Sequence, residues 1–422
     1  MEAAQVIARR ETRFPSQRNA QLTDSLTINL ELILLVVCLV AIATRWLRFP
    51  YSAGLVAAGC LLALLPRGIE IPLPPDKLFG ILLPPLIFEA ALQIRWTPFR
   101  REAPVILTLA FAGVVMAAML VATGMHVFTG WGWVGAIAFG FLIAATDPVS
   151  VIALFKELNV PPRLRFLVEG ESLFNDGVAA VGLAVTVAIA GGSELHSTTV
   201  AGLLIWKLLG GVLIGGGIAG ALLLLSGRTE DHLVELTLTT MAAYGSFLVA
   251  ERLETSGVLA SLSAGMVVGN LGWRGYISQT GRGYVESFWE YAAFLANSIV
   301  FIVIGLSEAH EAIGLFTRTA ATAIALVLLS RVATVYLLCK IFEGSHLAVE
   351  RRYQHVLVWG GLRGALALAL ALTLPGSVRE RDEIILAAFA VVAFSIFVQG
   401  LTMAPLIRRL RCEDRTVEKQ EA

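Results

Sequence analysis

Residues 133–155 read WVGAIAFGFLIAATDPVSVIALF, an apolar run that Asp147 and Pro148 interrupt beyond its middle. A transmembrane helix needs about 20 predominantly apolar residues, so the run is long enough to cross a bilayer. Pro148 has no amide hydrogen, so the carbonyl of Ala144 loses its intrahelical partner, and the proline ring disfavours helical backbone at Asp147. The run therefore predicts a membrane helix that breaks at Asp147.

An interrupted helix at membrane depth is tolerated only where it is buried in protein or lines a wet cavity. The break would leave oxygens of the Thr146 side chain and of the nearby backbone free to coordinate a cation. The alternative is a structural proline kink in which Asp147 serves as a cap. The sequence alone leaves both interpretations open.

The composition places the whole chain in the membrane class. Hydrophobic residues make up 57% of the 422 residues and charged residues only 15%, and the mean hydropathy is +0.76. A soluble protein of this length needs no such excess of apolar residues. The formal net charge is zero, so the charge balance suggests no nucleic-acid partner. The four cysteines are scattered and show no spacing typical of a metal site.

Apolar runs along the chain predict an all-α, polytopic membrane protein with about thirteen transmembrane helices. Residues 1–25 are expected to form an extracytoplasmic segment, residues 26–407 the transmembrane domain and residues 408–422 a short cytoplasmic tail. The predicted helices cover residues 26–44, 50–66, 78–94, 103–123, 133–155, 166–190, 201–226, 232–251, 256–272, 287–307, 318–340, 353–374 and 383–407.

Basic residues fall unevenly on the two sides of this arrangement, with nineteen in one set of alternate loops and at the C-terminus against six in the other set. Positive residues accumulate on the cytoplasmic side, so we expect a plasma (inner) membrane protein with its C-terminus in the cytoplasm. A shift of seven helices would superpose the fifth crossing, 133–155, on the twelfth, 353–374, in the opposite orientation. Transporters with inverted repeats have this geometry.

Ionisable side chains lie inside several of these apolar runs. Each one costs about 2.5–3.5 kcal/mol near the bilayer centre, so each needs a partner or a function. The set consists of Glu89, Asp147, Glu169, Glu171, Asp176, Arg331 and Arg363.

The run 166–190 places four polar residues on two adjacent helical faces. Ser172 and Asp176 stand four residues apart on one face, and Glu171 and Asn175 stand four apart on the next. We expect the first pair to face an ion path and the second to face neighbouring helices. A buried Glu171 needs a buried arginine, and the candidates are Arg331 first and Arg363 second. The alternative is that the whole set forms a structural polar lock between helices.

Two buried arginines cannot neutralise five carboxylates, and this surplus indicates transport. An unpaired carboxylate in a low-dielectric cavity holds either a proton or a metal cation, since each neutralises it. Oxygen ligands favour hard ions. If the loaded site can reorient and the empty, charged site cannot, the two fluxes are coupled. The charges therefore predict an exchanger of a small monovalent cation for a proton.

Three strings in these segments carry a family resemblance. ATDP at 145–148, EGESLFNDG at 169–177 and GLRGALALAL at 361–370 resemble, in this order, the NhaP/NHE branch of the cation/proton antiporters. Residues 250–260 and 294–306 resemble further segments of that family, so the likeness extends from about residue 30 to 407.

The resemblance implies a homodimer in which a core domain rocks against dimerisation helices. Core helices would lie near 78–190 and 318–407, and dimerisation helices near 26–66 and 201–272. The family's cation-site pattern falls on Thr146, Asp147, Ser172 and Asp176, with Glu89 as an outer member.

The resemblance also implies roles for the supporting residues. The family's helix-stabilising ion pair falls on Glu171 and Arg331. Asn175 stands where electrogenic relatives carry a second aspartate, so by analogy the antiport is electroneutral and Asn175 orients Asp176.

The sequence thus predicts secondary antiport of Na⁺, or of Li⁺ or K⁺, against H⁺. It predicts no cofactor, no enzymatic activity and no nucleic-acid partner. A cation channel is one alternative and would conduct without proton coupling. A Na⁺-coupled solute symporter would need more polar groups for an organic substrate than these runs contain. An intramembrane hydrolase would need a serine–histidine or paired-aspartate signature, which the apolar runs lack.

Overall fold

The computed structural model describes most of the chain, and this part is helical with no β-strand. The predicted segment 1–25, Pro148 and residues 413–422 of the predicted tail lie outside the described residues. The described residues are 31–44, 46, 51–64, 75–147, 151–152, 154–155, 158–191, 197–226, 230–311 and 317–412.

The helices of the first half of the chain follow the predicted apolar runs closely. They are Glu31–Thr44, α3 (Tyr51–Ala63), α4 (Pro75–Gln93), α5 (Trp96–Leu107), η1 (Thr108–Ala112), α6 (Gly113–Thr129), α7 (Trp133–Ala144), α9 (Pro162–Ala190) and α10 (Ser197–Ser226).

The second half of the chain is built in the same way. Its helices are α11 (His232–Thr240), η2 (Met241–Gly245), α12 (Ser246–Arg252), α13 (Gly257–Leu271), η3 (Gly272–Arg274), α14 (Gln279–Glu311), α15 (Arg318–Lys340), α16 (Arg351–Trp359), α17 (Ala365–Leu372), α18 (Arg381–Phe394), η5 (Ser395–Gly400) and α19 (Leu401–Leu410).

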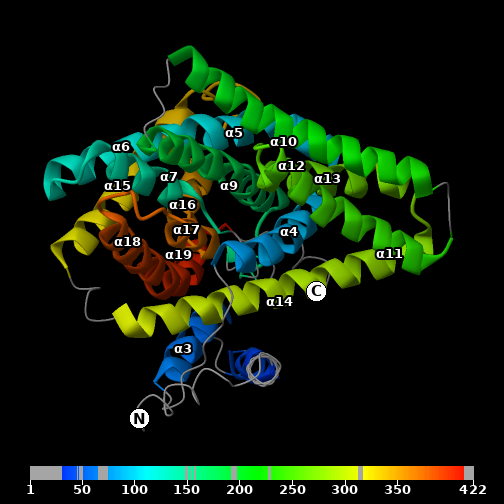
Figure 1. Ribbon diagram of the computed structural model, residues 1–422, viewed down its shortest axis with the longest axis horizontal. Helices are drawn as coiled ribbons and strands as arrows, with labels where there is room; N and C mark the ends of the chain where they lie inside the picture. Colours follow the sequence, from blue (N-terminus) through cyan, green and yellow to red (C-terminus); the bar gives the residue numbers. More distant parts are fainter. Residues whose placement is uncertain are drawn as a thin grey trace, which may run out of the picture.

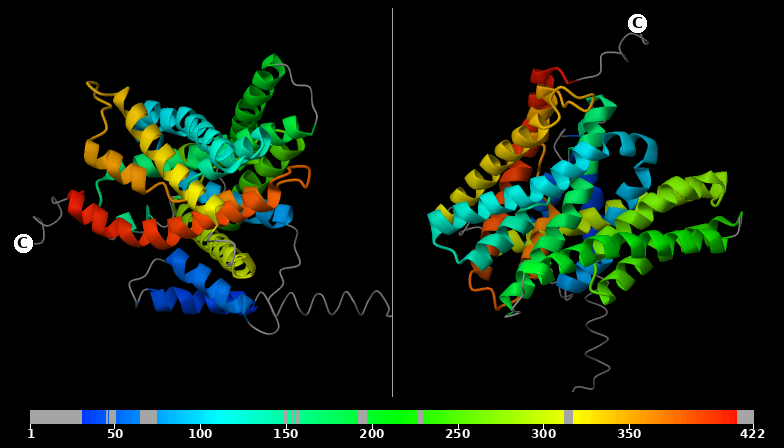
Figure 2. Two further views of the ribbon diagram at one scale, coloured as in Figure 1. Left: turned by 90° about the vertical axis from the view of Figure 1, so that its left-hand side faces the viewer. Right: turned by 90° about the horizontal axis from the view of Figure 1, so that it is seen from above.

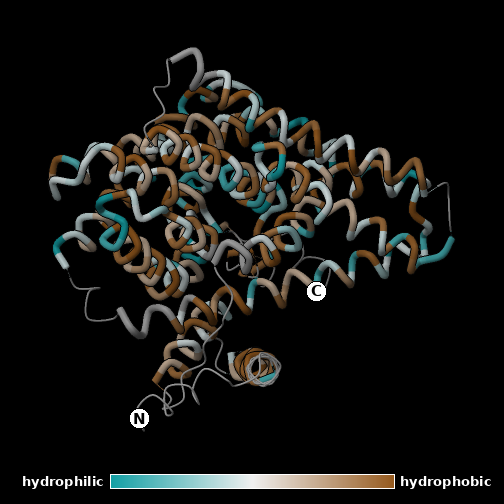
Figure 3. Tube along the Cα trace, in the orientation of Figure 1, coloured by the Kyte–Doolittle hydropathy of each residue, from teal (hydrophilic) through white to brown (hydrophobic). Residues whose placement is uncertain are grey.

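Six of the described helical stretches are long and apolar enough to cross a bilayer, and four shorter apolar helices accompany them. Long apolar stretches run through most of the helices in Figure 3. The predicted all-α, polytopic membrane class is therefore confirmed. The crossing predicted at 103–123 is longer than expected, because α5, η1 and α6 form one continuous helix, Trp96–Thr129. The six long stretches are Trp96–Thr129, Pro162–Ala190, Gly202–Ser226, His232–Arg252, Arg318–Lys340 and Arg381–Leu410.

Helix α14 joins two groups of helices. Figure 1 shows α10 to α13 on one side of the molecule and α6, α15 and α18 on the other, with α14 passing below both groups. It packs on α3 and α4 near the N-terminal part of the chain, on α11 in the first group and on α17 near the second. The left view in Figure 2 shows α14 nearly end-on, with cyan and green helices of the first half of the chain above it.

Glycines bring helix backbones together at two contacts between helices. A Cβ at Gly211 on α10 would lie 2.6 Å from the carbonyl oxygen of Ser256, and one at Gly265 on α13 would lie 2.8 Å from the carbonyl oxygen of Phe88 on α4. These neighbours are backbone atoms, so a side chain has no room at either position.

Helix α9 is anchored at its first turn. It begins at Pro162, whose fixed φ suits the first helical position. Arg163 forms two 3.1 Å hydrogen bonds with the buried Glu102 of α5 and donates to the carbonyls of Leu347 and Ala348 at 3.0 Å. The chain before α16 is thereby tied to α5 and α9, a link that the sequence did not predict.

Candidate functional site

Two membrane helices are interrupted, and they are the fifth and twelfth of the predicted crossings. Helix α7 ends at Ala144, residues 145–147 are not helical, and Val151 and Ile152, the next described residues, are helical. Helix α16 ends at Trp359, and residues 360–364 separate it from α17. The predicted break in the fifth crossing is confirmed, although α7 stops before Asp147 because Ala145 already has an extended ψ of 139°.

The carbonyl groups at the first interruption are bound by protein donors. Arg363 Nη1 donates to the carbonyls of Ala144 at 2.6 Å and Ala145 at 3.0 Å. The Ser172 hydroxyl donates to the carbonyl of Thr146. The sequence predicted that these oxygens would be free for a cation, but each of the three accepts a hydrogen bond from the protein. A guanidinium and a hydroxyl satisfy them instead, as the cost of burying bare carbonyls requires.

The amide groups of the same interruption are satisfied as well. The Thr146 N–H donates to Asn175 Oδ1 at 3.3 Å, and the Asp147 N–H donates to the Leu362 carbonyl at 2.8 Å. The second of these bonds joins the two interrupted helices directly, backbone to backbone. The first interruption is thus held in place by α9 and by the second interruption.

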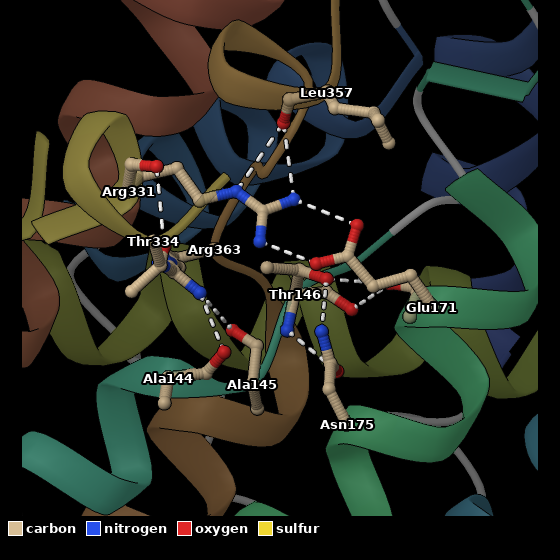
Figure 4. Close-up of polar contacts among 10 residues, drawn as sticks. Ala144, Ala145, Thr146, Glu171, Asn175, Arg331, Thr334, Leu357 and Arg363 are labelled. Carbon is tan, nitrogen blue, oxygen red and sulfur yellow. Dashed lines mark hydrogen bonds and ion pairs between the residues drawn. The ribbon is translucent and has the colours of Figure 1, made fainter. Parts of the chain in front are cut away.

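Thr146 is the centre of a buried hydrogen-bond group. Its Oγ1 lies 2.8 Å from Ser172 Oγ and accepts from Asn175 Nδ2 at 2.7 Å (Figure 4). Ser172 and Asn175 are three residues apart on α9 and expose 2% and 1% of their surfaces. The sequence predicted that Asn175 faces neighbouring helices and, from the resemblance, that it orients Asp176. Asn175 contacts Thr146 beyond the end of α7, and it lies on the same side of α9 as Ser172 because residues three apart on a helix share a face.

Glu171 and Arg331 form the expected buried ion pair. Arg331 Nη1 donates to Glu171 Oε1 and Nη2 donates to Oε2 at 2.9 Å, while Glu171 exposes only 2% of its surface (Figure 4). The guanidinium also binds the Leu357 carbonyl through Nε at 3.2 Å and Nη2 at 3.0 Å. One arginine therefore links α15, α9 and the end of α16. The prediction that Arg331 pairs with Glu171 is confirmed. Arg363 instead donates to the carbonyls of Ala144 and Ala145.

Arg363 and Arg331 each bind carbonyl groups near the C-terminal end of one interrupted helix. Arg363 binds the last carbonyls of α7, and Arg331 binds the Leu357 carbonyl near the end of α16. The C-terminal end of a helix carries partial negative charge, which a guanidinium neutralises. The two interruptions have similar capping contacts, although the arginines come from the twelfth and eleventh crossings and are not related by the seven-helix shift.

Asp176 lies beside this network with its carboxylate incompletely bonded. Within the part of the chain that the structure describes, only Asp176 Oδ1 and Arg363 Nε are buried side-chain nitrogen or oxygen atoms without a hydrogen-bond partner. The charges of Asp147 and Arg363 both act on Asp176, whose side chain is partly buried and whose Oδ1 is fully buried. Asp147 and Asp176 therefore share one electrostatic environment with a single guanidinium.

Gly364 makes room for the carboxylate of Asp147. A Cβ at Gly364 would overlap the Asp147 side chain, and one at Gly361 would lie 2.7 Å from Arg331 Nε. The GLRG string at 361–364 thus supplies two close contacts and one capping guanidinium.

Two other carboxylates from the sequence analysis have local partners. Glu169 forms a 2.6 Å ion pair with Arg165, one turn earlier on α9, so it does not belong to the carboxylate surplus that the sequence suggested. The count was wrong because the predicted crossing began only at residue 166, whereas α9 begins at Pro162 and includes Arg165. Glu89 accepts a hydrogen bond from Gln93 on α4, and its role as an outer member of the site remains a prediction. Among the described residues, no three His, Cys, Asp or Glu side chains gather as a metal-binding group.

The sequence of the chain is similar to a known family and to several known proteins. The sequence model of the transmembrane sodium/hydrogen exchanger family matches residues 32–409. The chain is 39% identical over 400 residues to the Na⁺/H⁺ antiporter ApNhaP of Aphanothece halophytica, covering 92% of this chain and 74% of that protein. It is 36% identical over 394 residues to the Na⁺/H⁺ antiporter NhaS2 of Synechocystis, covering 92% and 71%.

A solved structure has the same fold. The sodium proton antiporter MjNhaP1 from Methanocaldococcus jannaschii at pH 8 superposes with a TM-score of 0.74 at 18% sequence identity. The match covers 92% of this chain and 99% of that one.

Proposed function

The chain belongs to the transmembrane sodium/hydrogen exchanger family, and we propose that it is a Na⁺/H⁺ antiporter whose two substrates compete for the carboxylates Asp147 and Asp176. The buried and unbonded Oδ1 of Asp176 carries the proposal, since a carboxylate oxygen in this position calls for a proton or a cation. Relatives named as Na⁺/H⁺ antiporters give the substrate pair. The comparisons give no support to the channel or symporter alternative.

The charge balance of the site favours one-for-one antiport. Asp147 and Asp176 contribute two negative charges and Arg363 one positive charge, while Glu171 and Arg331 cancel each other. One proton or one monovalent cation then neutralises the remaining negative charge. A neutral site crosses the low-dielectric interior far more readily than a charged one, so only the loaded forms reorient.

Thr146 and Ser172 are suited to complete the cation site. Since the Ser172 hydroxyl donates to a carbonyl, the Thr146 hydroxyl donates to Ser172 Oγ, and Asn175 donates to Thr146 Oγ1. A hydroxyl oxygen has two lone pairs, so each oxygen keeps one beyond these bonds. We propose that these lone pairs and the two carboxylates surround the cation, with Asn175 holding Thr146 in place.

The remaining parts of the proposal follow from charge pattern and family. The protein would work as a homodimer in the plasma membrane with its C-terminus in the cytoplasm. It would act as a transporter and not as an enzyme, and ion gradients would drive it without a cofactor. Li⁺ and K⁺ are further candidate substrates, because hydroxyl and carboxylate oxygens bind any alkali ion.

We expect purified protein in proteoliposomes to move protons when a Na⁺ gradient is applied, without generating a membrane potential. A pH-sensitive dye and a potential-sensitive dye would be recorded together, with Na⁺, Li⁺ and K⁺ tested in turn. We expect no membrane potential because the empty site carries one net negative charge, which one proton or one Na⁺ neutralises. A proton flux that builds up a potential would contradict one-for-one antiport, and Na⁺ flux without proton movement would indicate a channel.

We expect Gly364→Ala to lower the rate of antiport at least about tenfold, because a methyl group at 364 displaces the Asp147 carboxylate and misplacement by about 1 Å is costly at such sites. The backbone at Gly364 has φ −137°, which alanine adopts, so the effect is steric. The measurement is Na⁺-driven proton flux per folded protein. Gly376→Ala is the matched control, since a Cβ at Gly376 has no neighbour within 4 Å. Equal fluxes in the two variants would contradict the proposed role of Asp147.

A further inference from the structure

A buried polar pair lies on the last crossing, apart from the site described above. Ser395 and Gln399 belong to the π-helical turn η5 and expose 1% and 3% of their surfaces. Ser395 Oγ donates to Gln399 Oε1 at 2.8 Å, and Gln399 Nε2 donates to the carbonyl of Trp359 at 3.2 Å. Placing polar side chains at membrane depth costs free energy, so we expect this pair to have a structural or functional role.

The carbonyl that Gln399 binds belongs to the second interruption. Trp359 is the last residue of α16, where carbonyls have no intrahelical partner. Arg331 binds the Leu357 carbonyl two residues earlier, and residues 360–364 follow with Arg363 among them. Gln399 therefore fixes the same end of α16 as Arg331, from a helix on another side.

This arrangement parallels the one at the first interruption. There, the amide of Asn175 on α9 binds Thr146 immediately after α7. In the predicted repeat, the sixth crossing, which contains α9, corresponds to the thirteenth, which contains Gln399. Each interrupted helix is thus held by one arginine and by one amide from the crossing that follows it. Single π-helical turns inside helices often occur at functional sites, and η5 carries both members of the polar pair.

We propose that Gln399 is a positioning residue for antiport. Its amide fixes the end of α16, and this keeps Arg363 against the carbonyls of α7 and beside Asp176. Ser395 orients the amide by occupying its carbonyl oxygen, so that the amino group faces Trp359. The proposal rests on the proposed antiport function, and Gln399 acts on the ions only through the interrupted helix.

The test compares three variants in proteoliposomes. Gln399→Met removes the amide at nearly constant volume, and we expect the KM for Na⁺ to rise about fivefold to tenfold and the pH profile to shift, with a smaller loss of kcat. Ser395→Ala keeps the amide but loosens it, so its effect lies between that of Gln399→Met and the unchanged protein. Thr402→Val is the matched control. The Thr402 hydroxyl accepts from the Trp359 indole at 2.9 Å and donates to the backbone carbonyls of Val398 and Gln399 on its own helix. It therefore contacts the Trp359 side chain but not the Trp359 carbonyl.

A second measurement does not depend on transport. Hydrogen–deuterium exchange in detergent reports on residues 357–364, and we expect faster exchange there in Gln399→Met than in Thr402→Val. Unchanged KM, pH profile and deuterium uptake in a folded Gln399→Met protein would overturn the proposal, as would equal changes in Thr402→Val. If Gln399→Met does not fold, the milder Ser395→Ala decides by the same criteria. Absence of Na⁺-driven proton flux in the unchanged protein would refute the proposed function, whereas deuterium uptake would still report on the role of Gln399.

Discussion

Asp176→Asn is expected to reduce Na⁺-driven proton flux to the level of empty liposomes, a loss of at least about 100-fold, while the protein stays folded. Asparagine has nearly the same shape as aspartate, but it cannot release a proton or offer a negative charge to a cation. The site then carries a charge balance of zero with no ion bound, because Asp147 and Arg363 compensate each other. Nothing remains for Na⁺ and H⁺ to compete for.

The measurement is proton flux in proteoliposomes, combined with size-exclusion chromatography to confirm folding. Added Na⁺ should stabilise the unchanged protein against heat, since a ligand that binds only the folded state raises its stability, and this stabilisation should vanish in the variant. Asp382→Asn is the matched control, because the Asp382 side chain on α18 is 95% exposed. Full flux in the Asp176→Asn protein would refute the proposed site.

Glu171→Ala is expected to destabilise the protein by about 3–5 kcal/mol, because it leaves the guanidinium of Arg331 buried without a counter-charge. The readout is the midpoint of thermal unfolding in detergent. Glu169→Ala is the control on the same helix. Its partly exposed pair with Arg165, one turn apart, contributes only about 0.3–0.5 kcal/mol.

A double variant separates the lost charge from the lost packing. Glu171→Leu combined with Arg331→Met removes both charges, and we expect it to recover part of the stability, since apolar replacements of buried ion pairs are often tolerated. Recovery should be incomplete because Arg331 also binds the Leu357 carbonyl. An unfolding midpoint in Glu171→Ala equal to that of Glu169→Ala would show that the pair does not hold the helices together.

The sequence predicted those features of the fold that depend on local chemistry. Apolar runs gave the helices, the proline after Asp147 gave the break in the fifth crossing, and the cost of burying Glu171 required an arginine. Burying a charge in the membrane is costly, so Glu171 required an arginine, and the family resemblance favoured Arg331 over Arg363, as the structure confirms.

The hydrogen bonds that hold the interrupted helices in place could not be predicted in the same way. Which donor reaches the carbonyls of Ala144 and Ala145 depends on how α7 and the segment 360–364 cross, and this is a property of packing. The direction of Asn175 depends on the rotation of α9 about its axis. Gln399 could have been identified from the sequence. A polar amide within an apolar run is costly to bury, as Glu171 is, so it needs a hydrogen-bond partner.

The bond between Arg363 and Ala144 spans 219 residues of sequence, and this has a consequence for biosynthesis. A ribosome makes the chain from its N-terminus, so α7 enters the membrane long before Arg363 exists. Until then the last carbonyls of α7 need temporary partners such as water or another part of the translocation machinery. A nascent chain that stops before residue 363 would lack the group that closes this gap. We therefore expect quality-control proteases to degrade chains that end before residue 363.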